Sequence, residues 1–219
     1  MKVLDSRFFD RAAENVAHDL IGCRLCWRKC DQTLSRTITE TEAYTGRDDL
    51  ASHAAKGQTK RNAPMFGHSG TFYVCFVHGV HWMLNVVTGP LGYPAAVLIR
   101  GVEGILGPGR LTKALSIHGN LNGKAANKKA GVWFSERSGK HTITRSSRIG
   151  VSYAGPIWSV KPYRSLPTKV TLPRNPSAKI RRFRVGVWIM WRFISKVYET
   201  SLSTELMDCS STPSTLEGR

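Results

Sequence analysis

Hydrophobic residues near the start of the chain recur at the spacing of an α-helix. Over residues 5–20 the apolar positions fall three or four apart, with Asp5 and Asp10 as candidate caps, until Gly22 ends the pattern. Such spacing gathers the apolar side chains on one face, so we expect a core-facing helix.

A strand pattern follows this helix. Residues 23–29 and 36–42 are strand-like runs on either side of a polar turn, which predicts a β-hairpin. Its second strand carries Glu40 and Glu42, and side chains two apart in a strand share a face, so both carboxylates should point the same way, beside Tyr44. Two interpretations stay open from this pattern: an acid–base site at a strand end, or a half-exposed strand whose charged face meets water.

A second hairpin is indicated between Gly70 and Val87. Residues 71–77 and 80–87 are rich in β-branched and aromatic side chains, and His78-Gly79 between them fits a two-residue turn with glycine where a positive φ is needed. A rigid hairpin of this kind is suited to act as a wedge in a base stack, although apolar hairpins also serve simply as core.

A loop and a buried strand flank this hairpin in the sequence. Residues 45–64 have no apolar period and are rich in Gly, Asp and Lys, which is typical of a functional loop or a short helix; this segment contains His53. Residues 94–100 form an apolar run that ends on Arg100, which predicts a buried strand.

The following segment predicts a helix that starts at a Pro-Gly motif. Gly107-Pro108-Gly109-Arg110 leads into apolar residues at helical spacing, and free backbone N–H groups at such a start, with Arg110 and Lys113, make a candidate phosphate site. Short strands are expected at residues 133–135 and 149–153.

The pattern changes near residue 166. Prolines interrupt the next stretch, residues 185–197 are apolar and aromatic and fit either an amphipathic helix or a docking strand, and residues 201–219 resemble a disordered tail. We therefore expect one domain over residues 1–165 and a basic, atypical C-terminal extension, partly disordered, over residues 166–219.

The net positive charge of the chain indicates a polyanionic partner. The 219 residues hold 32 Lys and Arg against 15 Asp and Glu, a formal charge of +17, and 41% of them are hydrophobic, as in soluble globular proteins. Most of the excess lies in residues 100–196, which hold 20 of the basic and 2 of the acidic residues. We expect this half of the chain to face phosphates.

The cysteines and the hydropathy of the chain indicate the cellular compartment of the protein. Cys23, Cys26 and Cys30 have the spacing of a metal motif, but strand alternation puts Cys23 and Cys26 on opposite faces, so we expect free thiols and no metal. No apolar run is long enough to span a membrane, and the first residues lack a signal-peptide core, so we expect no membrane partner. The expected location is the cytoplasm, with the nucleoid in a bacterium or the nucleus in a eukaryote.

Several of these motifs, in this order, resemble the alkyladenine (3-methyladenine, methylpurine) DNA glycosylase family. They are Glu40-Thr41-Glu42-Ala43-Tyr44, Met65-Phe66, the hairpin of residues 70–87, Leu98-Ile99-Arg100, Gly107-Pro108-Gly109-Arg110-Leu111 and Arg148-Ile149-Gly150-Val151. The resemblance covers residues 4–164 and implies a single α+β domain around a curved antiparallel β-sheet, with a protruding β-hairpin and peripheral helices. It also implies release of alkylated or deaminated purines from duplex DNA, with no metal or organic cofactor.

The resemblance assigns the water-activating carboxylate to Glu42. Arg100 and the backbone carbonyl of Ile149 would hold the same water, and Glu40 would be structural. A damaged purine is already an electron-poor leaving group, so one general base is enough. No lysine occupies a nucleophile position, and we therefore expect hydrolysis that leaves an abasic site.

The resemblance also assigns a base pocket. Tyr44, His53 and Asn85 match it, whereas Cys75 replaces a pocket tyrosine and His78 replaces the tyrosine that enters the base stack. Tyr44 and His53 would then hold the flipped base. The residues expected to contact DNA are His78, Gly79, His81, Arg110 and Lys113, and either Trp82 or His81 is expected to compensate for the lost ring.

The sequence thus predicts a monomeric, monofunctional purine DNA glycosylase of base-excision repair. The rival interpretation is a basic, non-catalytic protein that binds DNA or RNA, in which Glu42 is only a strand carboxylate. A carboxylate that faces phosphates repels them, so Glu42 and Arg100 at motif positions favour the enzyme.

Overall fold

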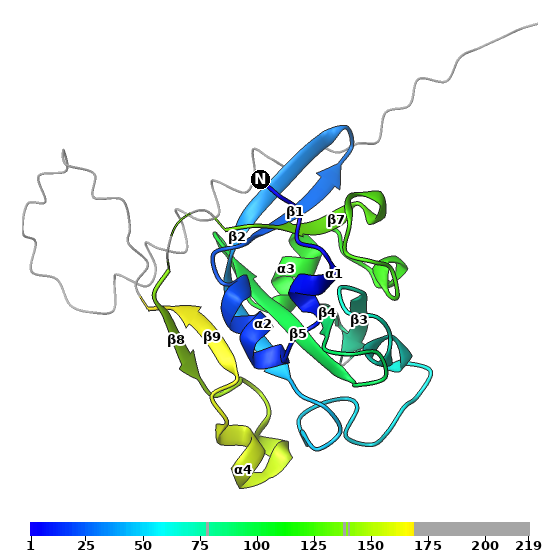
Figure 1. Ribbon diagram of the computed structural model, residues 1–219, viewed down its shortest axis with the longest axis vertical. Helices are drawn as coiled ribbons and strands as arrows, with labels where there is room; N and C mark the ends of the chain where they lie inside the picture. Colours follow the sequence, from blue (N-terminus) through cyan, green and yellow to red (C-terminus); the bar gives the residue numbers. More distant parts are fainter. Residues whose placement is uncertain (78, 138, 140, 169–219) are drawn as a thin grey trace, which may run out of the picture. The chain divides into compact units, whose positions relative to one another are not determined.

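The computed structural model describes residues 1–77, 79–137, 139 and 141–168. These form an α+β domain on one open antiparallel β-sheet, which confirms the expected fold class (Figure 1). The chain divides into two units, Met1–Val170 and Thr171–Arg219, and the second lies outside the described residues, as do the segments expected at 185–197 and 201–219. The division expected after residue 165 stays a prediction.

In the described part of the chain the sheet has nine strands. Its main path runs β3-β4-β5-β2-β1-β7, with β6 paired to β5, and with β9 paired to both β2 and β8. The strands are β1 (Arg24–Lys29), β2 (Gln32–Tyr44), β3 (Phe72–Val77), β4 (His81–Thr88), β5 (Ala95–Val102), β6 (Ile105–Leu106), β7 (Val132–Ser135), β8 (Ile143–Ser146) and β9 (Arg164–Pro167). The long strand β2 is central, because it pairs with β1, β5 and β9.

Short helices cover this sheet. The α-helices are α1 (Ser6–Phe9), α2 (Ala13–Leu20), α3 (Pro108–Ala114) and α4 (Gly155–Val160), and the 3₁₀-helices are η1 (Ala63–Phe66), η2 (Gly119–Leu121), η3 (Lys128–Ala130) and η4 (Ser152–Ala154). The apolar face of α2 packs against β2 and β5, and α3 packs against β4 and β5. Fully buried side chains in this core include Phe9, Leu20, Phe72, Ile99 and Phe134.

The single helix expected over residues 5–20 is wrong, since the segment forms α1 and α2 with a break between them. Asp5 caps α1 by accepting two backbone N–H groups, whereas Asp10 follows its last residue. Arg11 stabilises the break, because its guanidinium donates to a carbonyl of α1 and, over 2.9 Å, to Asp19 of α2. Apolar spacing carries no sign of such a polar bridge.

The strand expectations are largely confirmed, with two corrections. The first hairpin is β1–β2, residues 95–100 of the expected strand lie in β5 while Pro94 precedes it, and residues 133–135 lie in β7. In the second hairpin Val77 pairs with His81, so Val80 lies in the turn. The strand expected at 149–153 is wrong: this segment is a bend followed by η4, with Gly150 at φ +76°.

Candidate active site

A cavity of about 430 Å³ lies over the neighbouring strands β3, β4, β5 and β2. Further walls come from residues 51–53 of the loop after β2 and from residues 149–151 before η4, and Met65, Pro108 and Tyr153 complete the lining. Most lining side chains are apolar and a few are polar, which is typical of a site for a small organic group. Part of the loop over residues 45–64 therefore lines the cavity, and its last residues enter the short helix η1.

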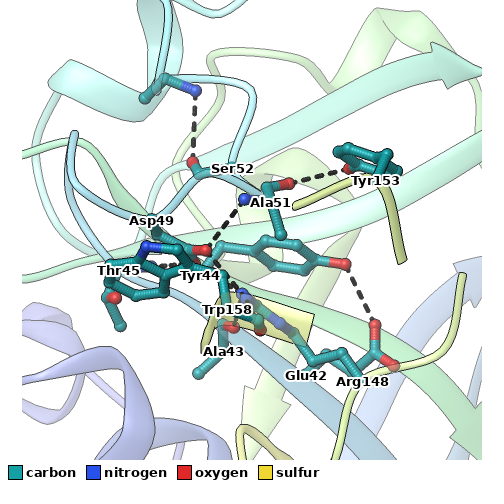
Figure 2. A network of polar contacts seen from close by, with 11 residues as sticks. Glu42, Ala43, Tyr44, Thr45, Asp49, Ala51, Ser52, Arg148, Tyr153 and Trp158 are labelled. Atoms are coloured by element: carbon teal, nitrogen blue, oxygen red, sulfur yellow. Dashed lines mark hydrogen bonds and ion pairs between the residues drawn. The ribbon is translucent and has the colours of Figure 1, made fainter. Parts of the chain in front are cut away.

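Glu42 lies directly behind the lining of this cavity. Its side chain is 0% exposed, and three lining residues contact it. The Tyr44 hydroxyl donates to Oε2 over 3.1 Å (Figure 2). The Ile149 backbone N–H donates to Oε1 over 2.8 Å, and Arg100 Nη1 lies 3.5 Å from Oε1. The interpretation of Glu42 as a half-exposed strand carboxylate that meets water is wrong, because its side chain is fully buried.

Burial dominates the protonation of this carboxyl group. It raises the pKa of Glu42, because the charged form loses its hydration, while Arg100, the Ile149 N–H and the Tyr44 hydroxyl oppose the rise. The result is a carboxylate that is more basic than an exposed glutamate yet still has three partners for its negative charge. General-base catalysis requires such a group.

Glu40 and Glu42 reach the same guanidinium, as their shared strand face predicts. Arg100 Nε donates to Glu40 Oε1 over 2.9 Å and Nη1 faces Glu42. Thr41, between them, points to the other face, where its hydroxyl donates to the carbonyl of Ala17 in α2. Arg100 itself lines the cavity.

His53 and Tyr73 form another wall of the cavity. Nδ1 of His53 and the Tyr73 hydroxyl are hydrogen-bonded over 2.8 Å, and the two rings meet edge-on at 6.0 Å. Burial, helped by the positive charge of Arg61, lowers the pKa of His53. The imidazole is therefore neutral at physiological pH, with one ring nitrogen used by Tyr73.

Asn85 and Cys75 lie on the adjacent strands under the same cavity. The amide nitrogen of Asn85 donates to the carbonyls of Tyr73 and Met83, over 3.0 and 3.3 Å, which fixes the orientation of the amide group. Cys75 is buried, and burial raises the pKa of its thiol, so it presents a neutral sulfur to the cavity. Cys23 and Cys26 are likewise buried free thiols.

Arg148 and Asp49 hold the site together from behind, and sequence reasoning gave neither a role. The guanidinium of Arg148 binds both Asp49 oxygens, and both side chains are 0% exposed. Asp49 also accepts the N–H groups of Thr45 and Ala51, so it shapes the loop after β2 (Figure 2). The signal that could have found Arg148 is its place in the motif with Ile149.

Aromatic rings surround that guanidinium and extend to the mouth of the cavity. The carbon Cζ of Arg148 lies 4.8 Å from the ring centre of Tyr44 and 5.2 Å from that of Tyr163. Tyr153, a residue that is 70% exposed, donates a hydrogen bond from its hydroxyl to the Ala51 carbonyl at the cavity edge. Tyr73 and Tyr153 were also missed, since neither has a distinctive sequence context.

The model of the methylpurine-DNA glycosylase family matches residues 7–106 and 104–169. This chain belongs to that family. Three similar proteins bear the name "Putative 3-methyladenine DNA glycosylase". The one from Methanocella arvoryzae is 39% identical over 175 residues, covering 71% of this chain and 88% of the relative. The Anaeromyxobacter sp. protein is 41% identical over 173 residues (74% and 87%), and that of Nitrosococcus oceani is 34% identical over 198 residues (82% and 94%).

His81, which was expected to contact DNA, lies against the start of α3 near the cavity. The imidazole of His81 lies so close to Gly109 that a Cβ there would be 2.7 Å from Cγ of the histidine. Pro108, the residue before Gly109, lines the cavity. The start of α3 therefore lies against the turn end of the second hairpin.

Of the other residues that were expected to contact DNA, three are exposed and one lies outside the described residues. Gly79 is exposed at the hairpin turn with φ +67°, and Arg110 and Lys113 are exposed on α3. His78 lies outside the described residues. Lys113 is in the last turn of α3, not the first as expected, so only Arg110 accompanies the helix start.

The described residues contain neither a metal-binding cluster nor a membrane-spanning helix. No group of three or more His, Cys, Asp or Glu side chains there could hold a metal ion. Likewise, no helix in that part of the protein is both long and apolar enough to cross a membrane.

Proposed function

We propose that this protein is a monofunctional DNA glycosylase that turns an alkylated or deaminated purine out of duplex DNA and hydrolyses its N-glycosidic bond. The observation that carries the proposal is the fully buried carboxylate of Glu42 behind a cavity of about 430 Å³, in contact with Arg100 and the Ile149 N–H. Cavities of a few hundred cubic ångströms suit a group the size of a purine. A strand carboxylate without a catalytic role has no need of such surroundings.

In this mechanism Glu42 deprotonates a water molecule that attacks the deoxyribose carbon of the damaged nucleotide. Burial keeps the carboxylate basic, and its charge stabilises the oxocarbenium-like sugar in the transition state. Arg100 faces the cavity beside Glu42 and would orient that water with the backbone of Ile149. The damaged purine leaves as an electron-poor base, and an abasic site remains.

Recognition of the flipped base would rest on Tyr44 and His53. The hydroxyl of Tyr44 is fixed by Glu42 and its ring by Arg148, while the ring of His53 is fixed by Tyr73. Rings held in this way provide flat surfaces on which a base can stack at little entropic cost. Neutral His53 adds a hydrogen-bonding nitrogen, and Asn85 and Cys75 form the floor.

The duplex would be held by positive charge next to the cavity. Arg110 is exposed at the start of α3, and His81 and Gly79 lie on the hairpin that would enter the base stack as a wedge with His78. Binding through phosphates releases counterions and should weaken steeply with added salt. A monomer bound to one damaged site is sufficient for this chemistry.

The test is base release from duplex oligonucleotides that contain one hypoxanthine, ethenoadenine or 3-methyladenine. Wild type should release the free base and leave alkali-labile sites, whereas Glu42→Gln should still bind and be slower by at least ~100-fold. Glu103→Gln is the matched control, because it removes the same charge from an exposed side chain between β5 and β6. If all three proteins bind alike and none releases base, the protein is a nucleic-acid-binding module.

A further inference from the structure

Glu40 sits beside the proposed catalytic centre, with two arginines on one of its oxygens. Its Oε1 accepts from Arg100 Nε over 2.9 Å and from Arg164 Nη1 over 3.1 Å. Arg164 is held in turn by a hydrogen bond from its Nε to the Ser146 hydroxyl. The side chains of Glu40, Arg100 and Arg164 are 11%, 13% and 22% exposed, so water screens these contacts only partly.

The backbone is irregular where Glu40 must reach Arg100. The pairing of β2 with β5 shifts register on both sides of Glu40. Gly101 faces this irregularity, and a Cβ there would be 3.3 Å from the Cβ of Glu40. Strand β9 brings Arg164 opposite Glu42 in the pairing with β2. Three separate strands thus converge on one carboxylate that does not line the cavity.

Arg100 contacts Glu40 more closely than it contacts Glu42. Its Nε has a short hydrogen bond to Glu40, whereas its Nη1 is 3.5 Å from Glu42, which is too long for a strong one. An arginine without a competitor would form a two-point pair with the buried carboxylate, which is the strongest geometry available to it. Such a pair would neutralise Glu42 and turn the guanidinium away from the cavity.

We propose that Glu40 is a positioning residue, whose hydrogen bond holds Arg100 away from Glu42 and keeps the guanidinium turned toward the cavity. Glu42 then has no two-point ion pair with Arg100 and is free to act as a base. This inference rests on the function proposed above. Arg164 moderates the effect, because it takes part of the negative charge of Glu40. The strand pair β8–β9 therefore contributes to the reaction without touching the substrate.

Charged and titratable groups face Glu42 from several neighbouring elements, including Tyr153 of η4. Arg100 comes from β5, Glu40 and Tyr44 from β2 itself, Ile149 N–H and Arg148 from the segment before η4, and Arg164 from β9 through Glu40. The negative charge of Glu40 raises the pKa of Glu42, after the larger effect of burial, and Arg100 lowers it. Removal of Glu40 should therefore lower the pKa of Glu42 in two ways, because the negative charge of Glu40 is lost and Arg100 can move closer to Glu42.

The first test is the pH dependence of single-turnover base release by Glu40→Gln. Loss of one negative charge and a closer Arg100 should move the midpoint of the acidic limb to lower pH, by about one pH unit. The plateau rate should fall by several-fold, with about 10-fold as the upper limit for a base weaker by about one pKa unit, because a weaker base abstracts the proton more slowly. The affinity for DNA should match that of Glu103→Gln, which carries the same net charge.

The second test predicts a shift of the acidic limb in the opposite direction. Arg164→Gln leaves Glu40 fully charged, so its acidic limb should move to higher pH, whereas Arg145→Gln, an exposed arginine of β8, should leave the limb in place. Thermal melting shows that each variant is folded, and if Glu40→Gln does not fold, the shift in Arg164→Gln decides. An unmoved limb in a folded variant overturns the proposal.

A third measurement separates this inference from the proposed function. Carbon-detected NMR titration of the Glu42 carboxyl group in the resting protein should show the same two opposite shifts without any turnover. Shifts without base release would leave the Glu40 contact in place and contradict the glycosylase proposal. Base release by wild type without shifts would contradict the role of Glu40 alone.

Discussion

Arg148 and Asp49 form a two-point ion pair in which neither side chain has exposed surface. The two residues are 99 positions apart in the sequence, and their pairing fastens the loop after β2 to the segment that ends in Ile149. Because Ile149 donates to Glu42, this ion pair fixes one of the partners of the proposed catalytic carboxylate.

The buried pair predicts a large loss of stability when one partner is removed. Asp49→Asn leaves the Arg148 guanidinium buried without a counter-charge, which should lower the free energy of unfolding by about 3–5 kcal/mol. Urea denaturation measures this loss. The half-exposed pair of Arg11 and Asp19 provides the control, since Asp19→Asn should cost less than about 1 kcal/mol. Equal losses for the two variants would contradict the role given to Arg148.

The raised pKa of Glu42 predicts a conflict between stability and function. Its ordinary value is 4.5, and because burial raises it, the folded protein binds this proton more tightly than the unfolded chain does. The stability that Glu42 contributes is then full at low pH and is lost as the pH rises through the folded pKa. Glu42→Gln, which resembles the protonated form, should melt at a higher temperature than wild type at about pH 7, with the advantage shrinking toward about pH 4. A lower melting temperature at neutral pH would count against this.

The contact between Tyr73 and His53 predicts a cost when the hydroxyl is removed. Tyr73→Phe keeps the ring but frees the imidazole to rotate, so the rate of base release should fall about 5-fold, the value of roughly one hydrogen bond. Tyr93→Phe is the control, because Tyr93 is absent from the cavity lining. An unchanged rate in Tyr73→Phe would mean that the wall of the cavity does not need this bond.

The close approach of Gly109 to His81 predicts a coupled loss of DNA binding. Gly109→Ala places a methyl group against the imidazole, which must move, and we expect about 10-fold weaker binding to duplex DNA. His81→Ala removes the obstacle, so the added Gly109→Ala substitution should cost little in that background. Binding isotherms for the four proteins of this double-mutant cycle test the coupling. Purely additive losses would show that the two residues act separately.

Local sequence patterns determined much of the architecture. The hairpin β1–β2, the buried strand β5 and the common face of Glu40 and Glu42 follow from alternation and turn residues, because these depend on neighbours a few positions away. The candidate residues Glu42, Tyr44, His53, Asn85 and Arg100 came from motif positions, and the structure brings them to one cavity or, for Glu42, directly behind it.

Only the tertiary structure decided how that cavity is completed. The backbone N–H of Ile149 donates to the carboxylate of Glu42, which lies 107 residues away in the sequence. The segment that was expected to be a strand therefore bends and leads into η4 instead. Arg148 and Asp49 are likewise partners from distant segments, and Arg164 reaches Glu40 because β9 pairs with β2. Contacts between distant segments leave no local periodicity, because they depend on how the sheet is assembled and not on the residues that flank each position in the chain.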